Sequence, residues 1–341
     1  MFGRKKIEKK SETAIGIDIG NFAVKAVQIT KKKEGYNLDG FGYCKIDLAK
    51  LDGVTEAVKS ACAEAKLEQK KVNTAIASDG AIVRYLMLPE MNKDDLNRAM
   101  QFEIERYVPF DKNEVVSDYV ILNERSETKN MKIMLVAAKR DVVDKRVKIF
   151  KSIGLEPEIV TIDSVVIKDT FQVNYPDRTD KTIGLINIGA KVSNINIIRD
   201  SISYFMRDVQ LGGDSITQLL KEKLDLDLGE AEKLKCILTH EDKEKFKVIE
   251  PVLGNLLNEI YLSFDYYESE FGMVVDEVFV SGGTAKLKLL IDFLKENLNR
   301  EVAILNSTNK ITVGPAVAKQ RLETYLSALV VPTGLALESF N

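Results

Sequence analysis

The sequence predicts a mixed α/β protein that consists of two related lobes, with a smaller subdomain inserted into the first lobe. Three observations lead to this prediction. Residues 14–78 read as β-β-β-α-β, residues 182–198 repeat the hairpin pattern of residues 14–30, and residues 81–155 read as β-α-β-β-α. The length of 341 residues suits two or three domains, at roughly 100–200 residues per domain.

The opening segment predicts three strands followed by a helix and a further strand. Residues 14–30 form two apolar runs joined by a turn at Gly20-Asn21, and a third strand begins at Tyr36 after a charged stretch. Apolar residues at helical spacing predict a helix over residues 55–67, and a short apolar run predicts a buried strand over residues 73–78. We expect the first lobe to comprise residues 1–80, 156–180 and 326–341.

The inserted subdomain is expected over residues 81–155. Its first strand ends at Pro89, and Asn92 is a good N-cap for the next helix, with Asp95 three residues later. Pro109 ends that helix, because the residue before a proline disfavours helical geometry. The remaining elements are two strands and a helix, predicted over residues 115–122, 132–138 and 141–152.

The second lobe is expected over residues 181–325. An apolar stripe at helical spacing from Leu253 to Phe271 predicts a long helix whose aromatic side chains lie in the core. This helix falls in a helical subdomain predicted near residues 218–270. A strand over residues 277–280 then leads into the segment Ser281-Gly282-Gly283-Thr284, and a helical segment follows.

Charge, cysteine and histidine content exclude several classes of protein. The chain has 49 basic and 52 acidic residues, and its net charge of −3 argues against nucleic-acid binding, which needs a concentrated positive field. Cys44, Cys62 and Cys236 are odd in number and lack metal-ligand spacing, which suits a reducing cytoplasm. A single histidine, His240, nearly excludes a Ser-His-Asp triad and multi-histidine metal sites.

Hydropathy gives no sign of a membrane segment. No apolar run reaches the roughly 18 residues of a membrane span. The N-terminal stretch MFGRKKIEKK is basic, but no apolar region follows it, so it does not read as a signal peptide. We interpret this stretch as a solvated end, with weak contact to an anionic membrane surface as the alternative. We therefore expect a cytoplasmic protein.

The first motif with chemical potential is the turn after the first strand. Gly20 and Asn21 form a tight turn whose backbone N–H groups can approach phosphate oxygens without a Cβ in the way. Asp18 at the strand end can hold Mg²⁺ through water, and Lys25 on the next strand can neutralise phosphate charge. Most Asp-x-Gly turns are only turns, so this motif alone does not define a site.

The second lobe repeats the turn and adds a double glycine. Asn187 and Gly189 occupy the equivalent place after its first strand, so two glycine turns can hold a phosphate chain from both sides of a cleft. Gly282 and Gly283 follow a later strand and allow close contact with a flat base or a ribose. The helix that comes next presents its N-terminus, which favours anions.

A fourth motif lies on a predicted helix of the second lobe. Glu232 and Lys235 are three residues apart, so both project from one helix face and can hold ribose hydroxyls. The alternative interpretation is a solvated helix face, which is the commoner origin of such a pair. Taken singly, each of the four motifs is better explained by an ordinary structural role, as a turn or as a solvated helix face, than by ligand binding.

The order of the motifs resembles that of the actin-like nucleotide-binding superfamily. A phosphate turn, an inserted subdomain, a second phosphate turn, an Ala-Glu-x-x-Lys helix and a strand ending in Gly-Gly follow one another along nearly the whole chain. Within the superfamily, the sequence resembles the PilM family of type IV pilus assembly proteins. The resemblance is carried by three segments, GIDIGNFAVKAVQI, YLMLPEMNKDDLNRAMQFEIERYVPFD and TYLSALVVPTGLALESF.

This resemblance implies an actin-like (ribonuclease H-like) fold with ATP and Mg²⁺ in the cleft between the lobes. It places the phosphates near Asp18, Gly20, Asn21 and Lys25 on one side and near Asn187 and Gly189 on the other, with Asp18 facing the metal. It also places the ribose at Glu232 and Lys235 and the adenosine at Gly282 and Gly283.

One position departs from the pattern of the superfamily. Position 187 usually holds aspartate and here holds asparagine, which keeps an oxygen but loses the charge that orients the metal and its waters. We therefore expect nucleotide binding with at most slow ATP hydrolysis.

The resemblance also implies a partner. Proteins of the PilM family bind the cytoplasmic N-terminal peptide of the membrane protein PilN, beside the inserted subdomain. A PilN-type partner would hold this chain at the inner face of the membrane, together with other pilus assembly proteins and with self-association open.

Two alternatives remain at this level. An FtsA-like division protein needs its own membrane anchor, and only four residues follow Leu337. A small-molecule kinase needs a general base in the cleft, for which Asp163 and Asp208 are the candidates near predicted strand ends.

Overall fold

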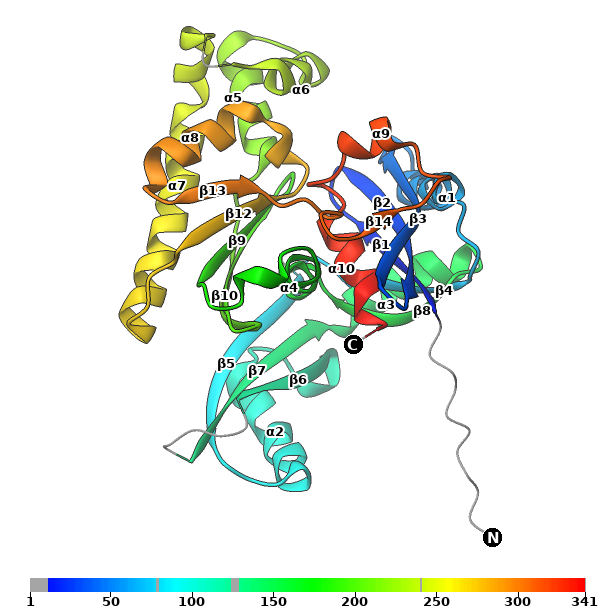
Figure 1. Cartoon of the computed structure of the whole chain (residues 1–341), viewed down its shortest axis with the longest axis vertical. Helices are drawn as coiled ribbons and strands as arrows, with labels where there is room; N and C mark the ends of the chain where they lie inside the picture. Colours follow the sequence, from blue (N-terminus) through cyan, green and yellow to red (C-terminus); the bar gives the residue numbers. More distant parts are fainter. Residues whose placement is uncertain (1–11, 78–79, 124–128, 240, 341) are drawn as a thin grey trace.

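The computed structural model describes residues 12–77, 80–123, 129–239 and 241–340. Two large sheets form the two lobes, and a third, smaller sheet lies below them in the inserted subdomain (Figure 1). His240 and the basic N-terminal stretch lie outside the described residues. No helix in the described part of the chain is long and apolar enough to cross a membrane.

The first sheet has six strands in the order β14-β3-β2-β1-β4-β8. Strands β1, β2 and β3 form an antiparallel meander, whereas β4 and β8 continue the sheet in parallel, as expected for strands that follow helical crossovers. The strands are β1 (Thr13–Ile19), β2 (Ala23–Lys32), β3 (Gly35–Lys45), β4 (Lys71–Ile76), β8 (Glu156–Ile162) and β14 (Thr312–Val313).

Helices cover both faces of the first sheet. Helix α1 (Gly53–Ala65) packs on one face, and α10 (Val330–Glu338) lies between β1 and helix α4 (Asp163–Asn174) on the other. This close packing depends on two glycines. A Cβ at Gly16 would lie 2.0 Å from the backbone oxygen of Pro332, and a Cβ at Gly334 would lie 2.0 Å from that of Val166.

The second sheet repeats the first. Its order is β11-β10-β9-β12-β13, with an antiparallel meander followed by two parallel strands, as in β3-β2-β1-β4-β8. The predicted internal repeat is therefore confirmed. The strands are β9 (Ile183–Ile188), β10 (Ser193–Arg199), β11 (Ile202–Val209), β12 (Glu277–Ser281) and β13 (Glu301–Ile304).

The predicted long helix of the second lobe is α7 (Lys243–Phe271), and its apolar stripe is buried, with Leu253, Ile260 and Tyr267 almost inaccessible to water. Figure 1 shows α7 running along the outer side of this lobe, with α5 and α6 near one end. The other helices are α5 (Gly213–Leu224), α6 (Leu228–Ile237), α8 (Lys288–Leu298), α9 (Lys319–Glu323) and the 3-10 turns η3 (Pro176–Arg178) and η4 (Thr284–Lys286).

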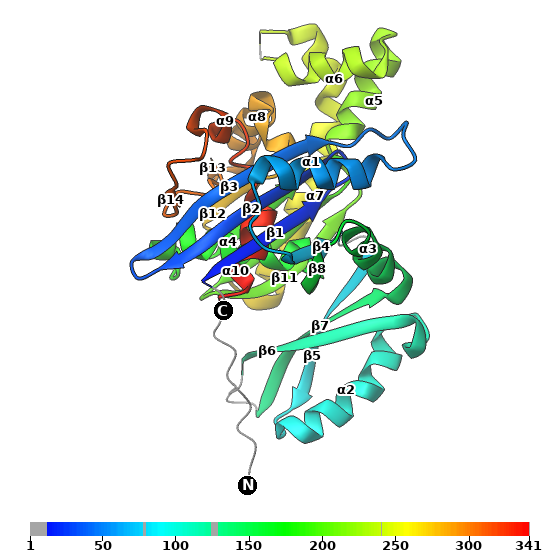
Figure 2. The same cartoon turned by 90° about the vertical axis from the view of Figure 1, so that its right-hand side faces the viewer.

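The inserted subdomain is a three-stranded antiparallel sheet with helix α2 on one face (Figure 2). As predicted, Asn92 caps α2, accepting a hydrogen bond from the backbone of Asp95 at 2.9 Å. Helix α3, by contrast, packs on the first lobe, where Phe150 is fully buried. The elements are β5 (Ala81–Pro89), α2 (Lys93–Tyr107), η2 (Lys112–Glu114), β6 (Val115–Asn123), β7 (Asn130–Lys139) and α3 (Arg140–Ser152). The boundaries of the lobes and of the insertion stay a prediction.

Candidate functional site

The two predicted glycine turns lie at equivalent places in the two sheets. Each follows the first strand of its meander, β1 in the first lobe and β9 in the second. Gly20 N donates to the carbonyl of Ala23 at 3.1 Å, and Gly189 N donates to that of Val192 at 3.0 Å. The turns thus have the same closing hydrogen bond, from the glycine to the residue three positions later.

The first turn carries charge. Lys25 Nζ donates to Asp18 Oδ2 at 2.8 Å, because the antiparallel register of β1 and β2 sets these residues opposite each other. Arg146 on α3 donates to the carbonyl of Ile19 at 3.2 Å; loss of water around its guanidinium lowers the pKa of Arg146, and the nearby Asp18 opposes that shift. Asp18 thus lies near two cations. A Cβ at Gly20 would lie 2.8 Å from Lys25 Nζ, so the small residue leaves room for this ion pair.

The second turn is held by neutral groups. The amide of Asn187 donates to Asn194 Oδ1 at 3.0 Å, and its oxygen accepts a hydrogen bond from the hydroxyl of Ser281 at 3.2 Å. The carbonyl of Gly189 accepts hydrogen bonds from Gly213 N at 3.0 Å and from the hydroxyl of Thr284 at 2.8 Å. Both ends of the Asn187 amide are therefore used to fix neighbouring strands.

The two glycines of the double-glycine motif have different surroundings. Gly282 has φ +95°, and a Cβ there would lie 2.3 Å from the carbonyl oxygen of Ile188 and 2.9 Å from Asn187 Oδ1. At Gly283, no described atom lies within 4 Å of the Cβ position. Gly282 therefore allows the strand end to pack against the second turn, whereas Gly283 faces open space.

The pair Glu232 and Lys235 points toward α5 and is not a solvated helix face. Lys235 is 7% exposed, and its ammonium donates to Glu232 Oε2 at 2.6 Å, to Thr217 Oγ1 at 2.9 Å and to the carbonyl of Gly213 at 3.3 Å. The same spacing of three residues that suggested a shared face brings both side chains into this network. The structure thus places the pair beside the N-terminus of α5.

Some residues of this region were missed by the sequence reasoning. Gly212 and Gly213 begin α5, and a Cβ at Gly212 would lie 2.4 Å from the carbonyl oxygen of Ala190 in the second turn. The double glycine ahead of a helical run is the signal that could have revealed them. Thr217 and Thr284 carried no such signal, because the side chains that contact Thr217 from α6 and the carbonyl that accepts from Thr284 are distant in sequence.

Side chains from both lobes meet beside these turns. Tyr43 and Tyr325 stack with ring centroids 4.2 Å apart, and the ammonium of Lys286 lies 3.8 Å from the Tyr325 centroid. Loss of water lowers the pKa of Lys286 to about 8, and the nearby charge of Lys25 acts in the same direction. Burial raises the pKa of Tyr43 to about 12, with a further contribution from Glu232. The charges of Lys25 in the first turn and of Glu232 on α6 therefore both affect the pKa values of side chains in this small region.

A magnesium ion fits this arrangement through one carboxylate. The described residues contain no cluster of three or more potential metal ligands from histidine, cysteine, aspartate and glutamate. Mg²⁺ usually keeps several waters and is held by one or two carboxylates together with substrate phosphates, so a single carboxylate such as that of Asp18 is compatible with a magnesium site.

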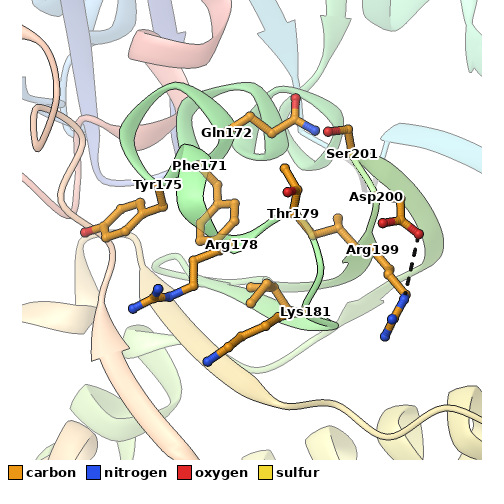
Figure 3. A pocket seen from close by; sticks show the side chains of 11 residues that line it. Phe171, Gln172, Tyr175, Arg178, Thr179, Lys181, Arg199, Asp200 and Ser201 are labelled. Atoms are coloured by element: carbon orange, nitrogen blue, oxygen red, sulfur yellow. Dashed lines mark ion pairs between the residues drawn. The ribbon is translucent and has the colours of Figure 1, made fainter.

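A separate pocket lies away from the predicted site residues, between the end of α4, η3 and the β10–β11 hairpin (Figure 3). Its basic side chains already have partners, since Arg178 and Lys181 pair with Glu277 and Arg199 pairs with Asp200. None of the predicted site residues lines this pocket.

Two sheets with one strand order and a glycine turn at the same place in each define a protein of the actin-like ATPase fold, as the sequence predicted. The family described as type IV pilus assembly protein PilM matches residues 16–340. The chain belongs to this family.

Solved structures agree with this assignment. The PilM-PilN type IV pilus biogenesis complex matches with a TM-score of 0.88 at 23% identity, covering 98% of this chain and 100% of the other. The ethanolamine utilization protein EutJ from Carboxydothermus hydrogenoformans gives 0.54 at 16% identity, covering 96% and 90%. MreB 5 of Spiroplasma citri bound to AMPPNP gives 0.52 at 10% identity, covering 96% and 95%. At these identities the likeness concerns the fold.

Proposed function

We propose that this chain is an ATP-binding scaffold of type IV pilus assembly that docks the N-terminal peptide of a PilN-type membrane protein on its inserted subdomain. The observation that carries the docking part is an exposed apolar sheet face beside the first lobe. The family match favours this function over an FtsA-like division protein or a small-molecule kinase.

The docking face is the side of the β5-β7-β6 sheet opposite α2. Its exposed members are Met87 on β5 and Val116 and Val120 on β6, which are 58%, 41% and 53% exposed. Side chains of alternate residues, such as Leu86, point to the other side and pack with α2. Large apolar groups gathered on one exposed face are typical of an interaction site, and β6 is an edge strand that can add an extended peptide.

The docking face borders the first lobe. Val136 on the same face packs in a cluster with Ile76 and Ile162, at the ends of β4 and β8. An extended apolar peptide on the exposed part would therefore lie in the angle between the insertion and the first lobe. A membrane partner bound there would hold this chain at the inner face of the membrane.

The nucleotide would occupy the region between the two glycine turns. Lys25 offers its charge to phosphates, Asp18 offers a carboxylate to Mg²⁺, and the N-terminus of α5 at Gly213 favours a nearby anion. Glu232 supplies an oxygen for ribose hydroxyls, and Gly283 leaves space for the adenosine. The Spiroplasma protein with this fold was solved with AMPPNP, which supports a nucleotide here.

Hydrolysis is proposed to be slow. Asn187 has no charge to orient a metal-bound water, and both ends of its amide already hold Asn194 and Ser281. Its side chain therefore fixes the second turn and cannot itself act as a base toward an attacking water. A hydrolysis rate comparable with that of efficient ATPases would contradict this part of the proposal.

The docking part is tested by calorimetry with a synthetic N-terminal peptide of a PilN-type protein. Val120→Asp places a charge on the exposed face and is expected to weaken binding at least tenfold, because a carboxylate must lose its water in an apolar contact. Leu51→Asp, at an even more exposed apolar residue in a loop of the first lobe, is the control for the added charge and is expected to bind as the wild type does. Equal binding by all three proteins would overturn the docking face.

A further inference from the structure

Lys132 joins the inserted subdomain to the second lobe through three aromatic rings. Its ammonium lies 4.2 Å from the ring centroid of Phe271, 5.0 Å from that of Tyr204 and 5.1 Å from that of Tyr85. Tyr85 is on β5 beside Lys132, whereas Tyr204 is on β11 and Phe271 is the last residue of α7. The cation therefore spans two units of the protein.

The rings on the second lobe form a packed cluster. Tyr204 meets Phe271 edge-on at 5.4 Å, and Tyr267, which is fully buried, lies 5.0 Å from Phe271. Such a cluster offers a fixed seat for a cation, because ring faces attract positive charge. Burial lowers the pKa of Lys132 to about 8, while Glu270 acts in the opposite direction. The aromatic cluster therefore also removes water that the ammonium would otherwise keep.

This contact closes one end of the docking face. Lys132 pairs with Met87 in the register of β5 and β7, and residues paired in this way project from the same side of a sheet. A peptide that occupies the face beside Met87 would therefore reach Lys132. Displacing the ammonium would exchange its ring contacts for water.

The other side of the contact leads to the candidate nucleotide site. Helix α7 has 29 residues and spans roughly 43 Å. Its buried residues Ile249 and Leu253 share one core with Leu220 of α5 and Ala231 of α6. Those two helices carry Gly213, Thr217, Glu232 and Lys235, so packed side chains connect the end of α7 to the proposed ribose-binding pair.

We infer that Lys132 and the rings of Tyr85, Tyr204 and Phe271 form a latch that couples occupancy of the docking face to nucleotide binding through α7. This inference rests on the proposed function. The latch is engaged in the structure described here, and we expect a bound peptide to change its engagement.

The latch itself is tested by hydrogen exchange measured by mass spectrometry on the full chain. Lys132→Met keeps the length of the side chain and removes the charge, and we expect severalfold faster exchange at the end of α7, where Gly272 N donates to the carbonyl of Glu268. Phe271→Leu removes the nearest ring from the other side and should act in the same way. Lys139→Met is the matched control, because Lys139 lies over Phe110 at 4.4 Å inside the insertion. Unchanged exchange in Lys132→Met and Phe271→Leu would overturn the latch.

The coupling is tested by calorimetric titration of the PilN-type peptide with and without ATP and Mg²⁺. In the wild type and in Lys139→Met we expect the two affinities to differ about fivefold. In Lys132→Met and Phe271→Leu the ratio should fall to about one. A ratio of one in the wild type, or an unchanged ratio in both latch variants, would overturn the coupling. Absence of peptide binding in every protein would overturn the docking proposal and the coupling together, and the exchange experiment would still decide the latch.

Discussion

The two glycine turns share a closing hydrogen bond and a place in their sheets, but they differ in side-chain chemistry. The first turn places Asp18 and Lys25 in an ion pair near Arg146, whereas the second uses the uncharged amide of Asn187 and the hydroxyl of Ser281. Closing hydrogen bonds and strand positions match between the lobes. The repeated fold thus supplies two places where backbone N–H groups can meet phosphate, and only the first turn adds charged side chains of its own.

The lobes also differ in where each one extends the shared five-stranded core. The first lobe is enlarged between β4 and β8, by the inserted subdomain and α3, whereas the second is enlarged between β11 and β12, by α5, α6 and α7. The Lys132 latch is a contact between these two enlargements. At this contact, therefore, the two lobes meet through regions that have no counterpart in the other lobe.

The largest expected effect concerns Gly282, where the end of β12 packs against the second turn. Gly282→Ala requires a positive φ of an L-residue and places a Cβ 2.3 Å from a carbonyl oxygen, so we expect a loss of about 3 kcal/mol in the free energy of unfolding. Gly20→Ala meets chiefly the flexible end of Lys25 and should lose less than about 1 kcal/mol. Urea unfolding followed by circular dichroism measures both. Equal losses would show that the two glycine positions are equally constrained.

Gly283→Ala is the control for this pair. It introduces the same methyl group one residue away, where φ is −65° and no described atom lies within 4 Å. We expect its unfolding free energy to stay within about 0.5 kcal/mol of the wild type.

Making the second turn charged like the first should be destabilising. Asn187→Asp removes the amide that donates to Asn194 Oδ1 and buries a carboxylate near Asp208, which itself accepts a hydrogen bond from Asn194 at 2.7 Å. We expect a loss of about 2 kcal/mol at pH 7. Burial raises the pKa of such a carboxyl above its unfolded value, so the loss should grow as the pH rises from 4 to 7. A loss independent of pH over this range, measured by urea unfolding, would contradict this account.

Removing one charge at a time from the first turn should distinguish the residue that binds the metal from the residue that binds the phosphates. Asp18→Ala is expected to weaken binding of ATP with Mg²⁺ about tenfold, as for loss of one charged contact. Without Mg²⁺ the same variant should bind ATP at least as well as the wild type, because Lys25 is released from its ion pair. Lys25→Met should weaken ATP binding in both conditions. Calorimetric titrations of the two variants with ATP, with Mg²⁺ and with EDTA, provide the comparison; weakening of Asp18→Ala in EDTA would contradict a metal role for Asp18.

Much of the fold could be predicted from the sequence because its signals are local. Apolar periodicity, the Asn92 cap and the Gly20 turn each depend on residues within a few positions, and the repeat could be recognised from two similar hairpins. Burial of Lys235 and the use of Asn187 by Ser281 could not be predicted, because their partners lie 18 and 94 residues away in the chain. The rings around Lys132 come from three separate elements for the same reason.

The smallest expected effect is the pH dependence of the latch. The pKa of Lys132 is lowered to about 8 in the folded protein from 10.5, so between these values the unfolded chain binds more protons than the folded one. Stability must then rise with pH in that window through this residue. The exposed carboxylate of Glu270 and the rings of Tyr85, Tyr204 and Phe271 lie around Lys132, and burial raises the pKa of Tyr85 well above the window. We expect the wild type to gain stability over Lys132→Met as the pH rises from 7 to 9.5, by less than about 1 kcal/mol because water screens a half-exposed cation. Urea midpoints of both proteins at the two pH values measure this gain, and a difference that stays constant with pH would mean that the rings hold the ammonium without removing its water.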